Sequence, residues 1–231
     1  MTKKETILVN GYEHISFDPP QTYSKEELIA RSKDYHNWLD QRRSIRMFSD
    51  KEVPRKVIEN IILSASTAPS GAHKQPWTFC AISDPAMKSK IREAAELEEK
   101  ISYESRMSER WKKDLEPLGT DMNKPFLEIA PWLIIAFKKA YDVDEDGNKH
   151  NNYYVNESVG IACGMMITAI HNAGLVTLTH TPSPMNFLAK LLNRPPNERA
   201  FILFPVGYPD KKVFVPNIKR KPLSEIGCFY E

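Results

Sequence analysis

The fold is decided by residues 158–182, whose sequence is SVGIACGMMITAIHNAGLVTLTHTP. Residues 158–172 are apolar and rich in glycine and alanine, which predicts a helix buried on several sides and packed closely against another helix. Residues 175–179 follow as a short strand. A buried helix that leads directly into a strand indicates a domain that mixes both elements around one core.

Apolar segments on either side continue this alternation. Residues 132–138 and 200–207 are predicted as buried strands, and residues 77–83 as a strand rich in aromatic residues. A helix is predicted to begin between Asp50 and Pro54, with Pro54 in its first turn. Its apolar stripe consists of Val57, Ile58, Ile61, Ile62 and Ala65. The chain therefore belongs to the α+β or α/β sandwich class, and it lacks the G-x-G-x-x-G and G-x-x-x-x-G-K motifs of Rossmann and P-loop sites.

The remaining segments are predicted to surround a single domain over residues 1–231. Residues 1–23 form a polar, extended arm, and Ser24 with Glu27 has the spacing of a capping box that opens a helix to Gln41. The charged stretch 86–115 is expected to be a helix without a core stripe, as in a surface element or a lid over 86–125. Two other segments complete the outline, namely an acidic surface loop at 142–152 and a basic tail at 211–231 that is expected to wrap over another surface.

Composition excludes several classes of protein. The chain has 231 residues and a net charge of +2, which argues against a nucleic-acid binder and against a polybasic membrane anchor. Its apolar runs are far shorter than the roughly 20 residues that span a bilayer, and no signal peptide is apparent. The three cysteines, Cys80, Cys163 and Cys228, lack a C-x-x-C pair. Free thiols without a metal site predict a cytoplasmic protein.

The segment Arg42-Arg43-Ser44-Ile45-Arg46 is the first candidate site. Its guanidinium groups and its hydroxyl could form bidentate contacts with a phosphate. The residues alone are equally consistent with a solvated helix end that carries cations at its negative pole.

Two loops are further candidates. In residues 69–77, Ser70 and nearby N–H groups could donate hydrogen bonds, and Gly71 would allow the backbone to approach a ligand closely. In residues 177–182, Thr181 lies where a strand ends and could face a ligand edge. Taken alone, the first segment favours an ordinary helix-to-strand turn, and the second is also explained by ordinary β structure. His73 has no partner at a metal or triad spacing.

Glu99 and Tyr103 lie four residues apart and so share one face of the charged helix, and Lys124 follows in the next loop. An anion, a phenol and a cation could hold a zwitterion, with Glu99 at an ammonium group and Lys124 at a carboxylate. Charged helices contain many such pairs, so the spacing alone favours a solvated face over a zwitterion site.

Together these segments resemble the nitroreductase superfamily of FMN enzymes and, within it, the iodotyrosine deiodinase family. The resemblance spans roughly residues 40–226. It is carried in family order by RRSIR at 42–46, TAPSGAHKQPWTF at 67–79, EEKISYESRMSERW at 98–111, ACGMMITAIHNAGLVTLTHTP at 162–182, PVGYP at 205–209 and KRKPL at 219–223. His180 departs from the family, which usually has a third threonine there, and residues 183–187 also differ. No membrane anchor of the kind found in vertebrate members is recognised.

The resemblance implies an α+β sandwich with a central, mostly antiparallel sheet flanked by helices. It further implies an intertwined homodimer with two FMN sites at the subunit interface. FMN would be held by the arginine segment (Arg42, Arg43, Ser44, Ile45 and Arg46), by Ser70 and Gly71 at the flavin, by Thr179, His180 and Thr181 along its edge, and by Arg220.

The resemblance also implies a halotyrosine substrate. The Ala72 N–H would meet the phenolate oxygen, while Glu99, Tyr103 and Lys124 would grip the zwitterion and close the lid. Thr181 at N5 of the flavin would be the catalytic residue that favours one-electron steps in reductive dehalogenation, with NAD(P)H or a reductase as the electron source. The rival interpretations are a general NAD(P)H-dependent nitro- or quinone reductase and a non-catalytic flavin-binding protein.

Overall fold

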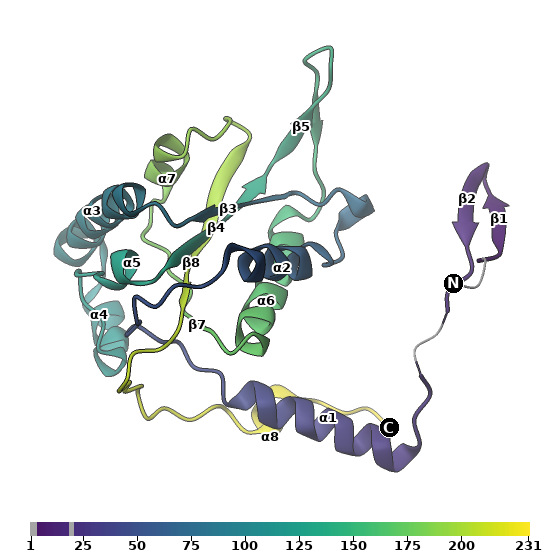
Figure 1. The fold of residues 1–231 in the computed structure, drawn as a ribbon, viewed down its shortest axis with the longest axis horizontal. Coiled ribbons are helices and arrows are strands. Elements are labelled where there is room, and N and C mark those ends of the chain that lie inside the picture. The colour runs from purple at the N-terminus through teal and green to yellow at the C-terminus, as the bar shows by residue number, and fades with distance from the viewer. Residues whose placement is uncertain (1–3, 19–20) are drawn as a thin grey trace. The chain divides into compact units, whose positions relative to one another are not determined.

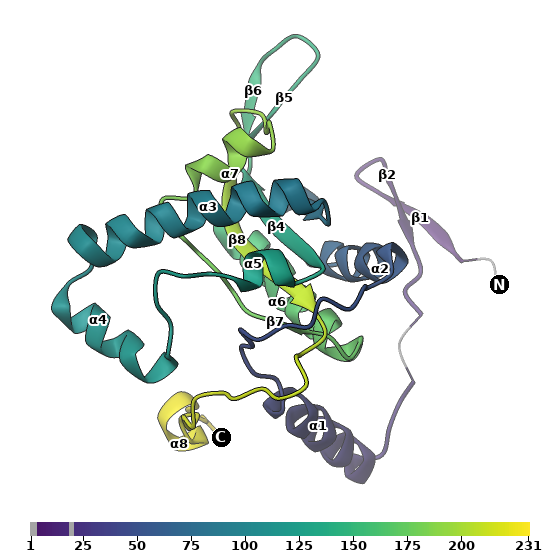
Figure 2. The same cartoon turned by 60° about the vertical axis from the view of Figure 1, so that its left-hand side comes forward.

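The backbone follows the alternation of helix and strand that the apolar segments predict. The structure is a computed structural model that describes residues 4–18 and 21–231. Its elements are labelled in Figures 1 and 2. The chain divides into two units, with the boundary between Gln41 and Arg42.

The first unit contains a β-hairpin and one helix. Strands β1 (Thr6–Val9) and β2 (Tyr12–Ile15) are joined by Asn10 and Gly11, which both have positive φ angles. The predicted extended arm is therefore wrong over these residues, because an Asn-Gly turn between two runs of high β propensity favours a hairpin. Residues 1–3 and 19–20 of that prediction lie outside the described residues.

Helix α1 (Lys25–Asp40) confirms the capping box. The Ser24 hydroxyl accepts from the Glu27 N–H at 3.2 Å, and the Glu27 carboxylate accepts from the Ser24 N–H at 2.8 Å.

The second unit is built on a four-stranded antiparallel sheet in the order β3-β4-β8-β7. Strands β3 (Trp77–Ile82), β4 (Trp132–Lys139) and β8 (Glu198–Gly207) lie within two residues of their predicted bounds. Strand β7 covers only Val176–Thr177 of the predicted 175–179, because the next residue to pair with β8 is His180, opposite Leu203.

Helices cover both faces of this sheet (Figures 1 and 2). On one face Ile134 and Ala136 pack against α2 (Arg55–Ser66) and α6 (Val155–Asn172). On the other, Leu133, Ile135 and Phe137 pack against α3 (Pro85–Ile101), α5 (Phe126–Ile129) and α7 (Asn186–Leu191). Alternate residues of β4 thus enter separate cores, which confirms the predicted α+β sandwich with an antiparallel sheet flanked by helices.

Helices α2 and α6 differ in detail from their predictions. Pro54 is the N-cap of α2 and precedes the first turn. Helix α6 buries one face only, because Ile161 is 47% exposed and an added Cβ at Gly160 or Gly164 would meet no described atom within 4 Å other than its chain neighbours and the backbone of α6 itself. The expected burial of α6 on several sides is therefore wrong within one chain.

The charged stretch after β3 is three elements, and its first part is anchored in the core. Ile91 and Ala95 of α3 are fully buried, so the predicted absence of a core stripe is wrong for this helix. One apolar residue per turn suffices to anchor α3, although the charged residues around it hide the periodicity. The π-helical segment Ser102–Arg106 and helix α4 (Glu109–Leu115) follow, and all residues of α4 are exposed or half-buried.

Short elements occur where loops or tail were expected. Strands β5 (Tyr141–Val143) and β6 (Lys149–Asn151) form a hairpin within the predicted acidic loop, and α8 (Leu223–Ile226) lies in the C-terminal tail.

Candidate functional site

The arginine segment runs beside β7 at one corner of the sheet. The Ile45 N–H donates to the Thr177 carbonyl at 3.1 Å, and Ser44 forms a parallel bridge with Thr177. Ile45 is buried whereas Ser44 is exposed. Ile45 therefore fixes the segment by packing and leaves the polar side chains available.

Positive charge gathers around this segment. Arg220 donates to the Arg42 carbonyl at 3.2 Å, and Arg43 donates to the carbonyl of Pro216. Burial lowers the pKa of Arg42, and the charges of Arg220 and Arg43 lower it further. Over residues 4–18 and 21–231, no ion pair with a carboxylate involves Arg42, Arg43 or Arg46. Such a cluster fits a phosphate group, which would supply the missing negative charge.

Glu99, Tyr103 and Lys124 come together in space, although their spacing alone favours a solvated face. The Glu99 carboxylate lies 3.6 Å from Lys124 Nζ, and these side chains are only 13% and 4% exposed. Lys124 Nζ also donates to Thr120 Oγ1 at 3.1 Å, while the Tyr103 hydroxyl donates to the Thr120 carbonyl at 3.1 Å. Burial raises the pKa of Glu99 and lowers that of Lys124, while the attraction between the two opposes both shifts.

Arg46 connects this cluster to the arginine segment. Its charge lowers the pKa of Lys124, and the pKa of Arg46 itself is lowered by burial against the opposing effect of Tyr103. Arg46 and Lys124 also act on His180, whose pKa falls to about 3, chiefly because of burial. Arg46 of the arginine segment, Lys124 of the Glu99 cluster and His180 of the loop 179–181 therefore lie close to one another.

Within that loop the side chains alternate. His180 is 5% exposed, its ring lies edge-on to Phe126, and its backbone exchanges hydrogen bonds with Leu203 at 2.9 and 3.0 Å. His180 Nε2 has no hydrogen-bond partner in the described chain. Thr179 and Thr181 are exposed, so a ligand could reach their hydroxyl groups. Their assigned contacts with a flavin remain predictions.

The loop between α2 and β3 has an unusual backbone. Ala72, His73 and Gln75 all have positive φ angles between 47° and 53°, a region costly for residues other than glycine. A Cβ at Gly71 would lie 2.9 Å from the Tyr153 carbonyl oxygen, so only glycine fits there without a shift. The Ser70 hydroxyl accepts from the Gln75 N–H at 2.9 Å. The Ala72 N–H has no acceptor in the described chain and could donate to a ligand.

Within one chain, this loop does not lie near the other predicted site residues. The loop leads into Trp77 of edge strand β3, which pairs with Lys138, whereas Ser44 pairs with Thr177 of the other edge strand near Trp132 and Val206. These corners are about 20 Å apart along the strands and about 14 Å apart across them, from ordinary strand geometry. Ser70, Gly71 and Ala72 therefore lie far from the remaining predicted residues.

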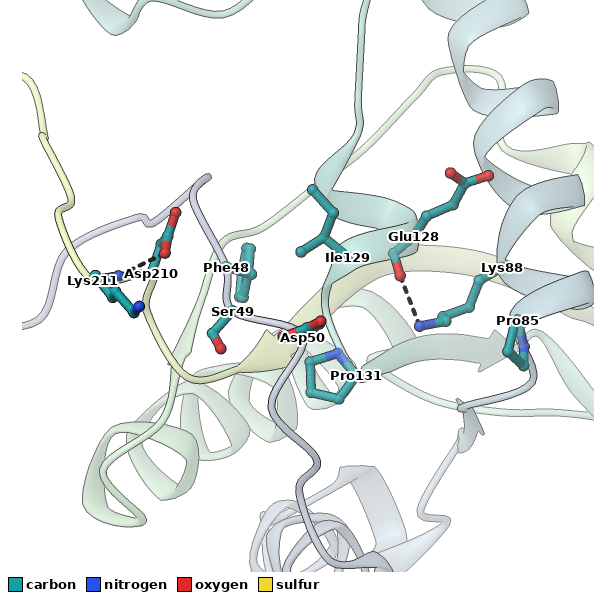
Figure 3. Close-up of a pocket in the computed structure, with 10 residues that line it drawn as sticks. All are labelled: Phe48, Ser49, Asp50, Pro85, Lys88, Glu128, Ile129, Pro131, Asp210 and Lys211. Carbon is teal, nitrogen blue, oxygen red and sulfur yellow. Dashed lines mark hydrogen bonds between the residues drawn. The ribbon is translucent and has the colours of Figure 1, made fainter.

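A pocket of about 500 Å³ is lined in part by Phe48 and Ser49, which follow the arginine segment, and contains none of the predicted residues (Figure 3). Lys88 lines it and donates to the carbonyls of Glu128 and Ala130 at 2.8 and 2.9 Å. Lys88 thereby caps the C-terminal end of α5, a role that no sequence pattern indicated.

Two negative findings complete the description. No group of three or more metal-ligating side chains occurs in the described ranges. None of the helices there is long and apolar enough to cross a membrane.

Comparison with known proteins agrees with this geometry. The Nitroreductase family model matches residues 39–208. Iodotyrosine deiodinase from Haliscomenobacter hydrossis is 59% identical over 90% of this chain and 94% of its own length. Human iodotyrosine deiodinase 1 is 46% identical over 93% of this chain and 74% of its own.

Solved structures agree as well. Oxidised iodotyrosine deiodinase bound to FMN and 3-iodo-L-tyrosine superposes with a TM-score of 0.73 at 28% identity, over 84% of this chain and 99% of that one. A nitroreductase-like protein from Streptococcus mutans shares the fold alone, with a TM-score of 0.64 at 16% identity over 87% and 100% of the two chains. The chain therefore belongs to the nitroreductase family and, within it, to the iodotyrosine deiodinases.

Proposed function

We propose that this chain is an FMN-dependent oxidoreductase that reductively removes iodine from 3-iodotyrosine to give tyrosine and iodide. One observation carries the proposal, namely the nearly buried Glu99–Lys124 pair at 3.6 Å beside Tyr103, close to Arg46 of the arginine segment. A buried ion pair is costly to maintain, so its presence beside a cofactor site supports a ligand that carries both charges.

The chain's own residues would divide the work of binding. Arg42, Arg43, Ser44, Arg46 and Arg220 would hold the FMN phosphate and ribityl chain, and Ile45 would support them from the core. FMN, once bound, supplies the electrons for the reduction. Thr179, His180 and Thr181 would run along the flavin edge, with the Thr181 hydroxyl at N5.

Substrate recognition would fall to the Glu99 cluster. Glu99 would accept from the substrate ammonium, while Lys124 and Tyr103 would donate to its carboxylate. Residues 102–124 would then close over the aromatic ring and exclude water, because this part of the predicted lid lies beyond the buried stripe of α3.

A second copy of the chain would complete the site. Ser70, Gly71 and Ala72 lie at the opposite corner of the sheet, so in a homodimer the partner could bring its own copy of this loop to the flavin. The free Ala72 N–H would then donate to the substrate phenolate. The open face of α6, with Gly160 and Gly164, supports close helix packing between subunits.

The cellular setting is part of the proposal. The free cysteines Cys80, Cys163 and Cys228 suit a reducing cytoplasm. NAD(P)H, or a reductase that uses it, would return electrons to the flavin.

The experiment is anaerobic. Purified holoprotein is reduced with dithionite, 3-iodotyrosine is added, and flavin reoxidation and iodide release are measured together. We expect stoichiometric iodide with 3-iodotyrosine and much less with 2-iodophenol, which lacks the zwitterion. Faster reoxidation by a nitroaromatic, with no iodide from iodotyrosine, would instead identify a general nitroreductase. Reoxidation by neither compound would favour a non-catalytic flavoprotein.

A further inference from the structure

The carbonyl oxygen of Ser183 accepts from two side chains of the π-helical segment. Arg106 Nη1 lies 3.2 Å from this oxygen, and Ser102 Oγ lies 3.4 Å from it. Arg106 Nη1 also lies 2.8 Å from a carboxylate oxygen of Glu98. Two donors separated by one helical turn thus converge on a single backbone acceptor.

The position of these contacts is unusual. Ser102 and Arg106 flank Tyr103 in the sequence, and Ser183 lies two residues after Thr181. The hydrogen bonds therefore join the segment that carries the zwitterion-binding phenol to the loop that carries the flavin-edge hydroxyl. Ser102 is 8% exposed, so one of the two bonds is largely shielded from water.

Stability alone gives these contacts little importance. The Arg106 side chain is 42% exposed, and exposed ion pairs contribute little to folding. Residues of π-helical turns are nevertheless often found at functional sites, where they redirect neighbouring side chains. The hydrogen bonds to the Ser183 carbonyl would therefore matter chiefly because they hold the Tyr103 segment in place.

We propose that Ser102 and Arg106 are positioning residues that hold the Tyr103 segment against the Thr181 loop through the Ser183 carbonyl. They fix the distance between the group that grips the amino acid and the group at the flavin edge. A substrate bound by Tyr103 is thereby held in the correct position relative to Thr181 at the flavin edge. This inference rests on the proposed function, since it assigns Tyr103 to substrate and Thr181 to FMN.

The test compares Arg106→Gln, Ser102→Ala and their double variant with Arg110→Gln, a matched control on the exposed face of α4. FMN affinity, the Kd of 3-iodotyrosine for the oxidised holoprotein, kcat and KM are measured for each. We expect the double variant to raise KM for 3-iodotyrosine about tenfold, as for the loss of one charge-assisted hydrogen bond. FMN affinity and nitroaromatic reduction should stay at the control level, and Arg106→Lys should recover part of the loss.

A second measurement does not depend on activity. Chymotrypsin should cleave the holoprotein of the double variant, without substrate, faster at Tyr103 and Trp111 than it cleaves the Arg110→Gln holoprotein. Equal cleavage, together with kinetics equal to those of Arg110→Gln, would overturn the proposed role. If the unmodified protein releases no iodide at all, the proposed function fails, and the cleavage comparison still decides whether Ser102 and Arg106 hold the segment in place.

Discussion

At the scale of single residues, Glu99 and Lys124 combine burial with opposite charge. Removing two charges from water costs free energy that their attraction offsets only partly. Here the cost is reduced by Thr120, whose hydroxyl accepts from Lys124, and by the Asp121 carbonyl, which also accepts from Lys124. A substrate zwitterion would replace the attraction between Glu99 and Lys124 by two attractions to the substrate, one for each charge. Substrate binding should therefore be linked to the order of the segment that carries these residues.

Glu99→Gln should therefore weaken substrate binding without loss of the cofactor. We expect KM for 3-iodotyrosine to rise about 10- to 100-fold, because a hydrogen bond between charged groups is lost. Glu93→Gln is the matched control, since Glu93 is an exposed residue of the same helix. Steady-state kinetics and FMN titration measure both effects, and equal KM values in the two variants would contradict the assignment.

Thr181→Ala should separate two kinds of chemistry. Loss of the hydroxyl at the flavin edge should slow iodide release about 10-fold, because one hydrogen bond that stabilises the transition state is lost, whereas nitroaromatic reduction should persist. The measured quantity is the ratio of the two rates in one preparation. A ratio unchanged from that of the unmodified protein would rule out the assigned role of Thr181.

His180 should make stability depend on pH. Its pKa falls from 6.5 to about 3 on folding because of burial and the charges of Lys124 and Arg46. The unfolded chain therefore binds more protons between these values, and the stabilisation is complete above about pH 6.5 and is lost as pH falls toward 3. Each unit of difference corresponds to about 1.4 kcal/mol. His180→Thr should flatten this acid limb in urea unfolding measured from pH 7 to pH 4, and parallel curves would show that His180 does not control it.

At the scale of elements, the open face of α6 is where a second chain would pack. Gly164 has no described atom within 4 Å of an added Cβ, so a large side chain fits within one folded chain but not within a close helix contact. Gly164→Phe should therefore leave the circular dichroism spectrum intact and shift the protein from dimer to monomer in light scattering. A variant that remains dimeric at the same concentration would place the interface elsewhere.

Elements with strong periodicity were predictable, and those set by turns were less so. The stripe of α2 and the continuous apolar runs of β4 and β8 specify their structures directly. The β1–β2 hairpin was missed although its Asn10-Gly11 turn is a clear signal. The buried stripe of α3 is hidden among charges, because only Ile91 and Ala95 mark it.

The candidate site was predictable to the same limited extent. Glu99 and Tyr103 share a helix face by spacing alone, whereas the approach of Arg46 and His180 to Lys124 depends on how loops cross the sheet edge. The distance in space between Gly71 and Arg42 depends on the order and direction of the strands in the sheet, which no local sequence pattern specifies. The positions of Ser102 and Arg106 against the Ser183 carbonyl likewise required the folded chain.

At the scale of the whole molecule, cofactor binding should stabilise the fold. A ligand that binds only the folded state adds about 2.7 kcal/mol at 100 times its Kd, so FMN should raise the Tm of the cofactor-free protein. The paired arginines supply a control, because Arg42→Ala with Arg43→Ala should abolish most of the shift. Riboflavin lacks the phosphate and should therefore raise the Tm of both proteins only weakly and to the same extent. Differential scanning fluorimetry measures these shifts in Tm. An equal shift from FMN and from riboflavin would exclude a phosphate anchor.

The placement of Ser44 and Gly71 at diagonal corners of one sheet has a genetic consequence. In the proposed homodimer, a chain damaged at Arg42 and a chain damaged at Gly71 should each be inactive alone, yet a mixed dimer would contain one centre built entirely from undamaged halves. Co-expression of the two should restore activity that neither possesses. Two alleles of this protein could thus rescue one another, although they affect the same polypeptide.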